Sequence, residues 1–177
     1  MERNLIIQNN ADTYSREIDW LNSLINLRLE KHFSNNSSSS FNIIPPDCKN
    51  DNSIYANWIK KHDLKSFERL VIISSLAYIY TPNVFDKFLI KNKGLDKRFT
   101  EFGGKIDDKN SRFIPTLETL TFLHFGNEVA AKFNTQIIFS ENHLFNKKGI
   151  INFGEKNEND SVISRTITLS EEIIQLL

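Results

Sequence analysis

Apolar residues recur at helical spacing near the start of the chain. Between Asp12 and Phe33 they return every three or four positions, which is the period of a helix that buries one face. The repeating positions are Ile18, Leu21, Ile25 and Leu29, widened by Trp20 and Leu24. We therefore expect a long amphipathic helix over 12–33, preceded by a frayed start over 1–10.

The pattern then changes to polar residues and prolines. Asn35 to Ser40 is a run of Asn and Ser, which is typical of a mobile loop. Ile43 to Pro46 should be extended, because a residue before proline avoids the helical region. A short helix from Asn52 or Ser53 to about His62 should follow and bury its aromatic residues.

Ser66 to Ile79 is apolar on nearly every side, so we expect a core helix surrounded by other elements. Pro82 should end it and open the next helix, with Thr81 as its cap. The buried face of that next helix would consist of Phe85, Phe88 and Leu89. The polar segment 92–110, which holds three glycines, is predicted to be a long loop.

The last part of the chain mixes helical and strand signals. Thr116 should cap a helix from Leu117 to Phe125 that ends at Gly126, and Glu128 to Phe133 should form another short helix. Two β-like runs follow and predict an antiparallel hairpin with a long charged tip. The runs are Leu144–Phe153 and Val162–Leu169, and Ser170 should cap a terminal helix to Leu177.

This order of elements predicts a mostly helical α+β fold. The order, in which several helices precede a C-terminal hairpin, is also similar to that of a winged-helix domain. The length of 177 residues fits a single domain over 1–177. Within it, 1–41 would be the N-terminal helix with a mobile Ser/Asn loop, and 42–177 the helical core with the hairpin.

Composition narrows the function classes. Hydrophobic residues make up 40% of the chain, including 14 Phe, and the formal net charge is +0. That content is enough for a core, and the neutral balance does not favour nucleic acid or an anionic membrane as a partner. The single cysteine, Cys48, excludes an internal disulfide and suits a reducing compartment. We expect a cytoplasmic protein without a signal peptide or a membrane span.

Signatures of nucleotide and metal chemistry are missing from the sequence. A P-loop needs a spaced glycine before Gly-Lys and a hydroxyl after the lysine, and Gly103-Gly104-Lys105 has neither. The four histidines match no metal-ligand spacing; they are His32, His62, His124 and His143. We expect no enzyme activity, no cofactor and no metal for this chain.

The best candidate for a functional site is the segment Phe99-Thr100-Glu101-Phe102-Gly103-Gly104. Its two glycines favour a turn, and its two phenylalanines can pin that turn to the core. The same segment can also be a docking loop that touches a partner, and one loop can do both. Thr116 and Glu118 are secondary candidates, explained first as the cap and the dipole partner of their helix.

A DNA-binding hypothesis finds little support. The best candidate for a recognition helix, Leu117 to Phe125, offers Thr119, Thr121 and His124 among core residues. The predicted hairpin mixes cations with anions; they are Lys147, Lys148, Lys156, Glu155, Glu158 and Asp160. The expected basic face is therefore not evident.

A series of short motifs runs along the chain. In order they are Pro45-Pro46-Asp47, Asp51–Asn57, Glu68–Val71, Phe99–Gly104, Phe113–Thr119, His143–Phe145 and Ile167–Ser170. Their order and spacing resemble the N-terminal region of a family of bacterial AAA+ ATPases. The family is frequent in Bacteroidetes, and some members accompany contractile injection systems. The resemblance covers about Tyr14 to Leu177, and its specificity lies in the series. The chain departs from the family pattern at Ile54, at Leu117 where glycine is usual, and over Glu158–Ser164.

The resemblance implies a variant winged-helix domain whose ATPase module would begin beyond Leu177. Its implied role is protein–protein recognition, either by presenting a substrate or assembly partner to the motor or by positioning the motor. An isolated domain would be a monomer or a weak dimer, and the resemblance allows a hexameric full-length protein. The alternatives are a nucleic-acid-binding winged helix and an enzyme of unrecognised type.

Overall fold

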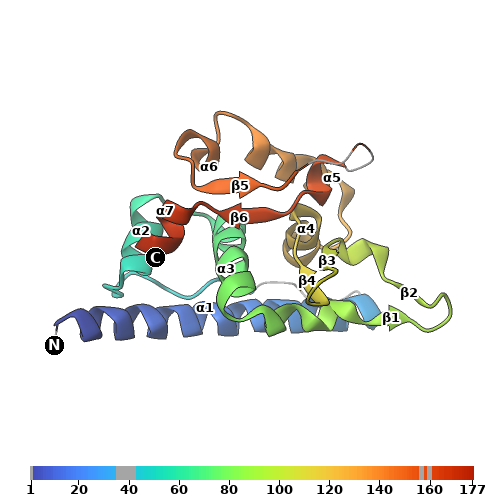
Figure 1. Cartoon of the computed structure of the whole chain (residues 1–177), viewed down its shortest axis with the longest axis horizontal. Coiled ribbons are helices and arrows are strands. Elements are labelled where there is room, and N and C mark those ends of the chain that lie inside the picture. The colour runs from blue at the N-terminus through green and yellow to red at the C-terminus, as the bar shows by residue number, and fades with distance from the viewer. Residues whose placement is uncertain (1, 35–42, 156–157, 159–160) are drawn as a thin grey trace.

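The computed structural model of the protein describes residues 2–34, 43–155, 158 and 161–177. A single long helix, α1 (Glu2–Phe33), runs along one side of the molecule, and three later helices pack against it (Figure 1). The predicted loop Asn35–Ser40 lies outside the described residues. Of the helices described, none combines the length and apolar content needed to span a bilayer.

Helix α1 begins earlier than the sequence pattern predicted. The expected frayed start over 1–10 is wrong from Glu2 onward, because this segment contains no Gly or Pro that would break a helix. Asn10 also fixes this N-terminal part of the helix. The Asn10 side chain donates to the carbonyl oxygen of Leu177 and accepts a hydrogen bond of 3.1 Å from the backbone N–H of Tyr55. Both contacts come from segments far away in the sequence.

Helix α2 (Ile54–Lys61) confirms the predicted short helix. Ser53 is its N-cap, and the Ser53 Oγ accepts a 3.0 Å hydrogen bond from the N–H of Ala56. Such a bond satisfies one of the unpaired donors of the first turn. The helix buries Tyr55, Trp58 and Ile59 as expected.

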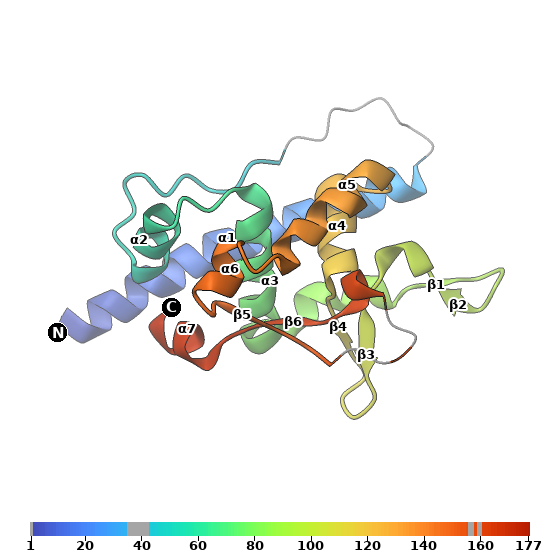
Figure 2. The same cartoon turned by 90° about the horizontal axis from the view of Figure 1, so that it is seen from above.

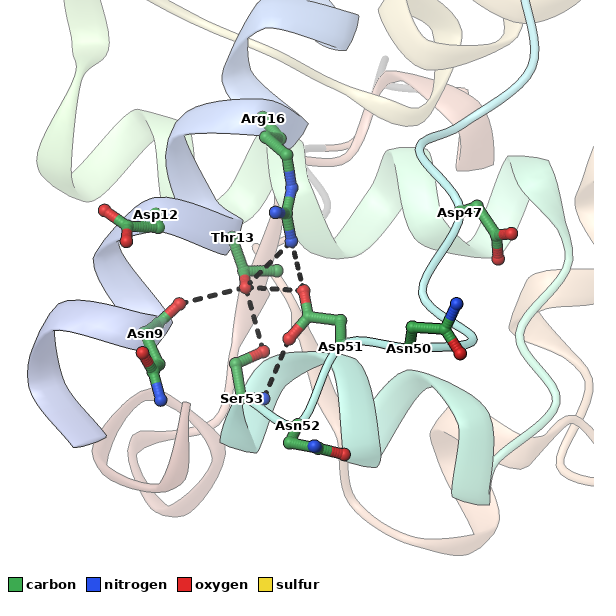
Figure 3. Close-up of a pocket in the computed structure, with 9 residues that line it drawn as sticks. All are labelled: Asn9, Asp12, Thr13, Arg16, Asp47, Asn50, Asp51, Asn52 and Ser53. Carbon is green, nitrogen blue, oxygen red and sulfur yellow. Dashed lines mark hydrogen bonds and ion pairs between the residues drawn. The ribbon is translucent and has the colours of Figure 1, made fainter. Parts of the chain in front are cut away.

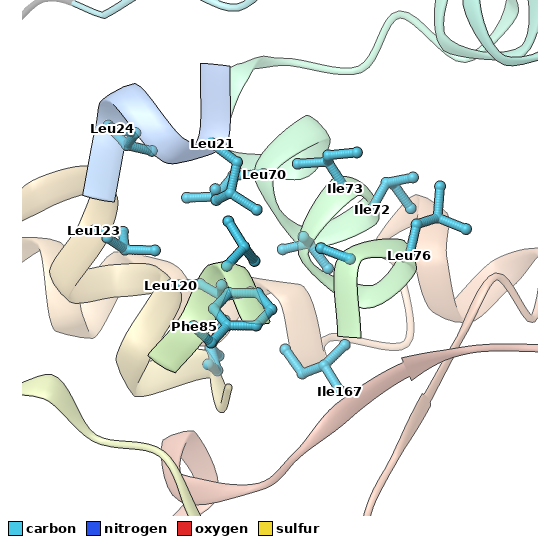
Figure 4. Packing of buried hydrophobic residues seen from close by; sticks show 14 of the residues in the cluster. Leu21, Leu24, Leu70, Ile72, Ile73, Leu76, Phe85, Leu120, Leu123 and Ile167 are labelled. Atoms are coloured by element: carbon cyan, nitrogen blue, oxygen red, sulfur yellow. The ribbon is translucent and has the colours of Figure 1, made fainter. Parts of the chain in front are cut away.

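Helix α3 (Ser66–Tyr80) is the core helix that the sequence predicted. Every residue from Arg69 to Ala77 is buried, because other elements cover all sides of the helix. Figure 4 shows side chains of α1, α3 and α4 meeting around Phe85 and Ile167. Those labelled there are Leu21, Leu24, Leu70, Ile72, Ile73, Leu76, Leu120 and Leu123.

The turn after α3 forms η1 (Pro82–Leu89), a 3₁₀ helix with Pro82 in its first turn. Phe85 and Phe88 are buried as predicted, and Leu89 is half-buried. Thr81 precedes the helix, but its side chain does not cap it. Instead the hydroxyl of Thr81 shares a 2.7 Å hydrogen bond with the Tyr14 hydroxyl of α1.

The predicted long loop over 92–110 is wrong, since this region forms two small hairpins. Figure 2 shows both hairpins projecting from the body. Their strands are β1 (Lys91–Asn92) with β2 (Lys97–Arg98), and β3 (Lys105–Asp107) with β4 (Arg112–Ile114). Strands of two or three residues are too short to give an alternating pattern. Their turns use positive φ angles at Asp96 and Ser111, which sequence patterns do not reveal for residues other than glycine.

Helix α4 (Leu117–Phe125) begins and ends where the sequence predicted. The backbone N–H of Thr116 donates to the Thr119 hydroxyl at 3.2 Å, completing a reciprocal cap. Gly126 closes the helix at a positive φ of 73°. The last carbonyl groups are also satisfied by Arg28 of α1, which donates to Leu123 at 3.0 Å and to His124 at 2.9 Å.

The segment after α4 is short and helical. It contains α5 (Val129–Thr135), which agrees with the predicted short helix, and η3 (Gln136–Phe139). The first β-like run, 144–153, is only partly a strand, because it starts as α6 (Leu144–Lys147). The imidazole Nδ1 of His143 accepts a 3.2 Å bond from the N–H of Phe145, so this turn is capped as a helix.

The C-terminal hairpin itself is confirmed. Its strands are β5 (Ile151–Phe153) and β6 (Ile167–Leu169), paired antiparallel with Ile151 opposite Leu169. The second run, 162–169, begins as η4 (Val162–Ser164) before it becomes a strand. The predicted terminal helix is α7 (Glu171–Leu176), and Ser170 precedes it, but the predicted side-chain cap is wrong, because the Ser170 hydroxyl makes no capping bond to this helix. The protein is therefore a mostly helical α+β fold with small antiparallel sheets.

A buried ion pair joins the long helix to the core helix. Glu17 of α1 is 0% exposed, and its carboxylate accepts from the Arg69 guanidinium of α3 and, at 3.2 Å, from the Tyr55 hydroxyl of α2. The same guanidinium lies 3.4 Å from the Sγ of Cys48. Burial raises the pKa of Glu17, and the neighbouring Arg69 works against that shift. One carboxylate thus fixes three helices.

We predict that Glu17→Ala lowers the free energy of unfolding by about 3–5 kcal/mol, since it leaves a buried guanidinium without its partner. The double variant Glu17→Met with Arg69→Met should lose less than Glu17→Ala alone, because it removes both buried charges and keeps the volume. Urea unfolding of the three proteins measures this. A double variant that loses as much stability as Glu17→Ala, or more, would contradict this coupling of the two charges.

Candidate functional site

The loop predicted as a docking site, 99–104, forms a short 3₁₀ turn, η2 (Thr100–Phe102), fastened to the core. Phe102 is 1% exposed, and its ring centroid lies 5.0 Å from that of Phe122 and 5.6 Å from that of Phe88. Phe99 is half-buried and Thr100 is exposed. The loop therefore has a buried anchor and an outward edge, as the sequence suggested.

The two glycines of this loop are required by its surroundings. Gly103 and Gly104 have φ angles of +61° and +80°, a region that only glycine adopts freely. A Cβ on Gly104 would lie 2.1 Å from the ring of Phe113, and one on Gly103 would lie 2.9 Å from the side chain of Glu118. The backbone of the loop therefore packs directly against β4 and α4.

The structure brings the secondary candidates to the same place. The Thr116 hydroxyl accepts a 3.1 Å hydrogen bond from the N–H of Gly104, so the cap of α4 also holds the loop. Glu118, Arg98 and Thr100 line a hollow of about 310 Å³ together with Phe99, Gly103 and Gly104. Nothing in the spacing of 99–104 and 116–118 along the chain predicts this meeting.

Glu101 points to a different neighbour. Its carboxylate lies 3.7 Å from the Nε2 of His32, at the end of α1, and its side chain is 37% exposed. Glu101 does not line the hollow that holds Glu118. The hollow therefore has one carboxylate and one guanidinium, which suits polar contacts with a partner.

A larger polar hollow of about 510 Å³ was not singled out by the sequence. It lies between α1 and the segment before α2 (Figure 3). Asn9, Asp12, Thr13 and Arg16 form one wall, and Asp47 and Asn50–Ser53 form the other. The signal that could have found it is the Asp-Asn-Ser sequence, which turn formation and capping also explain.

The polar groups of this hollow bond mainly to one another. The Thr13 hydroxyl is 2.7 Å from Asp51 Oδ2 and 3.0 Å from the Ser53 hydroxyl, and Arg16 donates to the same carboxylate. Asp51 Oδ1 accepts from the N–H of Ser53 at 2.8 Å. Asp47 likewise accepts from the N–H of Lys49 at 2.9 Å. Turn formation and capping thus account for Asp47 and Asp51.

Asp51 stays a carboxylate in this network. Burial acts to raise its pKa, but the hydrogen bonds from Ser53 and Thr13 outweigh burial, so the pKa of Asp51 lies below its ordinary value. A carboxylate held in this way is an acceptor rather than a proton donor near neutral pH. The network therefore joins α1 to α2 and offers no general acid.

Two polar residues of the candidate recognition helix are buried, and two lysines assigned to the hairpin belong to another element. Thr119 and Thr121 of α4 are 0% exposed, so α4 cannot present them to a base edge. Lys147 and Lys148 belong to α6 and its end, not to the hairpin as predicted; Lys156 and Asp160 lie outside the described residues. Within the described ranges, no group of three or more His, Cys, Asp or Glu is arranged to hold a metal ion.

Comparison of the chain with family models, with curated proteins and with solved structures finds no match in any of the three. The resemblance of the motif series to AAA+ ATPases therefore stays a prediction.

We predict that Gly104→Ala destabilises the protein more than Gly149→Ala. Gly149 also has a positive φ, +57°, but nothing lies within 4 Å of the position that a Cβ would take there, so Gly149→Ala should lose only about 1–2 kcal/mol from backbone strain. Gly104→Ala adds the collision with Phe113 and should lose about 1–3 kcal/mol more. Chemical unfolding compares the two. Equal losses would mean that the loop does not pack against β4.

We predict that Asp51→Asn removes stability only above the acid range. Because folding lowers the pKa of Asp51, its contribution is fully present above the unfolded value of about 3.9 and is lost as the pH falls through the folded value. Urea unfolding at a series of pH values should show the two proteins differing near neutrality and converging on acidification. A difference that persists unchanged to the lowest pH would contradict the role of Asp51.

Proposed function

We propose that this chain is a non-catalytic protein-interaction module, the N-terminal region of an AAA+ ATPase whose nucleotide-binding module follows Leu177. In that role it recruits a substrate or assembly partner or positions the motor, in the cytoplasm. The motif series carries the ATPase part of this proposal. The geometry of the last helices and the hairpin supports the interaction part.

The arrangement supports a variant winged-helix domain as the finer fold. In such a domain, three helices precede a hairpin, and the second hairpin strand pairs with the segment between the first two helices. Here α3, α4 and the α5–α6 segment precede β5–β6. Thr116 forms an antiparallel bridge with Thr166, and the N–H of Leu117 lies 3.4 Å from the carbonyl oxygen of Arg165. The hairpins β1–β2 and β3–β4 would be insertions between α3 and α4.

The observation that carries the proposed function is an apolar stripe on the α5–η3 segment. Val129, Phe133 and Ile137 follow one another at steps of four residues and are 65%, 70% and 68% exposed. A helix before the wing would read DNA if its outer face were polar or basic. Apolar groups gathered on a surface instead indicate a protein contact. We call these three residues the α5 stripe.

An apolar hollow of about 250 Å³ adjoins the α5 stripe. Phe67, Phe125, Ile137 and Ile138 line it together with Lys65, Glu68, Asn134, Thr135 and His143. The Nε2 of His143 lies 3.2 Å from Glu68 Oε1 at this wall. A hollow with an apolar floor and polar walls suits an anchoring apolar side chain of a protein partner. The occupant that we propose is such a side chain.

The loop 99–104 would make a second contact. Thr100 is exposed, while Phe102 holds the loop in the core. A rigid loop with an outward polar edge is suited to docking. We therefore propose that Thr100 belongs to this second contact.

We predict that a photo-crosslinking amino acid placed at Phe133 forms protein adducts in the cells that naturally make this protein. The same residue at Thr100 should also form adducts, and at Lys109, an exposed turn residue, it should form few. The reason is that the α5 stripe and the loop edge lie in the proposed contact. Crosslinked products are separated by mass and digested with nuclease or protease to identify their class.

A second measurement separates folding from function. Phe133→Ser and Ile137→Ser replace exposed side chains, so they should change the melting temperature little. If one partner contacts both surfaces, these substitutions should also abolish the adducts formed at Thr100. Nuclease-sensitive adducts at Phe133, or equal labelling at Phe133 and Lys109, would refute the interaction proposal. The first of these outcomes would favour the nucleic-acid hypothesis.

A further inference from the structure

The β1–β2 hairpin gathers positive charge at one end of a neutral molecule. Its eight positions, 91–98, contain four cations and one anion, although the chain as a whole has a net charge of +0. The cations are Lys91, Lys93, Lys97 and Arg98, all exposed, and the anion is Asp96. Figure 1 places this hairpin at the end of the molecule opposite the N-terminus. We call residues 91–98 the basic hairpin.

The charges of the basic hairpin oppose its own folding. Lys91 lies directly opposite Arg98 in the strand register, so two like charges share one face, an arrangement that destabilises a strand pair. Asp96 relieves part of this by bonding to Lys91 at 3.2 Å. For Lys93, Lys97 and Arg98, the described part of the chain shows no ion pair. An unfavourable arrangement that local stability does not explain points to function.

Hydrogen bonds within the turn fix the conformation of the basic hairpin. The Asn92 side chain accepts a 2.9 Å hydrogen bond from the N–H of Gly94, and the N–H of Leu95 donates to the Asn92 carbonyl at 3.2 Å. Asp96 closes the turn at a φ of +47°. These bonds hold Leu95 at the tip, where it is 69% exposed. The hairpin thus presents one exposed apolar side chain, and the exposed Lys93 and Lys97 flank it in the sequence.

We propose that the basic hairpin is a docking site for an acidic protein segment that carries an apolar side chain. Carboxylates of the partner would pair with Lys93, Lys97 and Arg98, and its apolar side chain would cover Leu95. Arg98 also lines the hollow beside Thr100, so the contact would continue onto the loop 99–104. The inference rests on the proposed function in taking the partner to be a protein.

A nucleic acid fits this surface less well. Leu95 lies at the tip and is 69% exposed, where a phosphate backbone would meet an apolar group. Bases would also need exposed aromatic rings for stacking, and Phe99, the ring nearest in sequence, is half-buried. The apolar contact at Leu95 therefore favours a protein segment, whose carboxylates would pair with the cations.

The probe for the test is a fluorescent glutamate-rich peptide with a central leucine, measured by anisotropy against the whole chain. Lys97→Glu with Arg98→Glu should weaken binding about tenfold or more, because it reverses the charges that face the probe. Lys147→Glu with Lys148→Glu makes the same change of net charge at another exposed site and should leave binding within about twofold. Leu95→Ala should weaken binding of the leucine peptide more than that of the same peptide with alanine.

Folding is monitored in the same proteins. The variant Lys97→Glu with Arg98→Glu places an opposite charge across from Lys91, so its melting temperature should equal or exceed that of the natural chain, while its affinity for the probe falls. A random-sequence DNA duplex serves as the competing probe. Tighter binding to the duplex that depends on the basic hairpin would overturn the inference, and so would equal losses in the two charge-reversed variants.

The two proposals can fail separately. Protein adducts at Phe133 combined with no hairpin-dependent peptide binding would remove this inference and leave the interaction module in place. Hairpin-dependent peptide binding without adducts at Phe133 would leave the hairpin as the only docking site and remove the α5 stripe from the proposed function.

Discussion

The buried carboxylate of Glu17 is the constraint on which the arrangement of the helices depends. It accepts from Arg69 of α3 and Tyr55 of α2 while belonging to α1, so it fixes how these helices sit against one another. Removing two charges from water is unfavourable, and a buried pair is tolerated only when its geometry satisfies both partners. Part of this demand remains unmet, because no residue in the described part of the chain accepts a hydrogen bond from the buried Nε of Arg69. The pair therefore specifies one packing of the helices rather than adding much net stability.

A second charged group extends the same frame to the other end of α1. Arg28 donates to the last carbonyl groups of α4, where a cation also suits the helix dipole. Burial lowers its pKa to about 10, which still leaves it charged at neutral pH. Gly126 makes room for this side chain, since a Cβ there would lie 2.7 Å from the guanidinium. With α1 fixed at Glu17 and Arg28, the exposed positions of β1–β2 and α5 can differ in sequence without disturbing the core.

Sequence patterns found the parts of the fold that local chemistry determines. The apolar run of α3 and the Thr116 cap of α4 follow from periodicity and capping, which act over a few residues. The hairpins at 91–98 and 105–114 were not predicted, because strands of two or three residues are too short to show an alternating pattern of apolar and polar residues. The candidate loop was found through Phe99, Phe102 and the two glycines. Its contact with Thr116 could not be predicted, because that contact depends on the pairing of β3 with β4, which brings Gly104 beside Thr116.

Exposed apolar side chains and opposed like charges indicate the candidate contact surfaces better than the volume of a hollow does. The hollow around Thr13 and Asp51 is the larger polar one, yet its hydroxyls and carboxylate bond to each other and to Arg16, so it already performs a structural task. The α5 stripe and the basic hairpin differ from this hollow, because they leave apolar or like-charged groups exposed. Phe133 and Leu95 are left open to water, and Arg98 faces a like charge. Burying such groups against a partner gains free energy that the isolated chain leaves unused, and this is the physical reason for placing the function there.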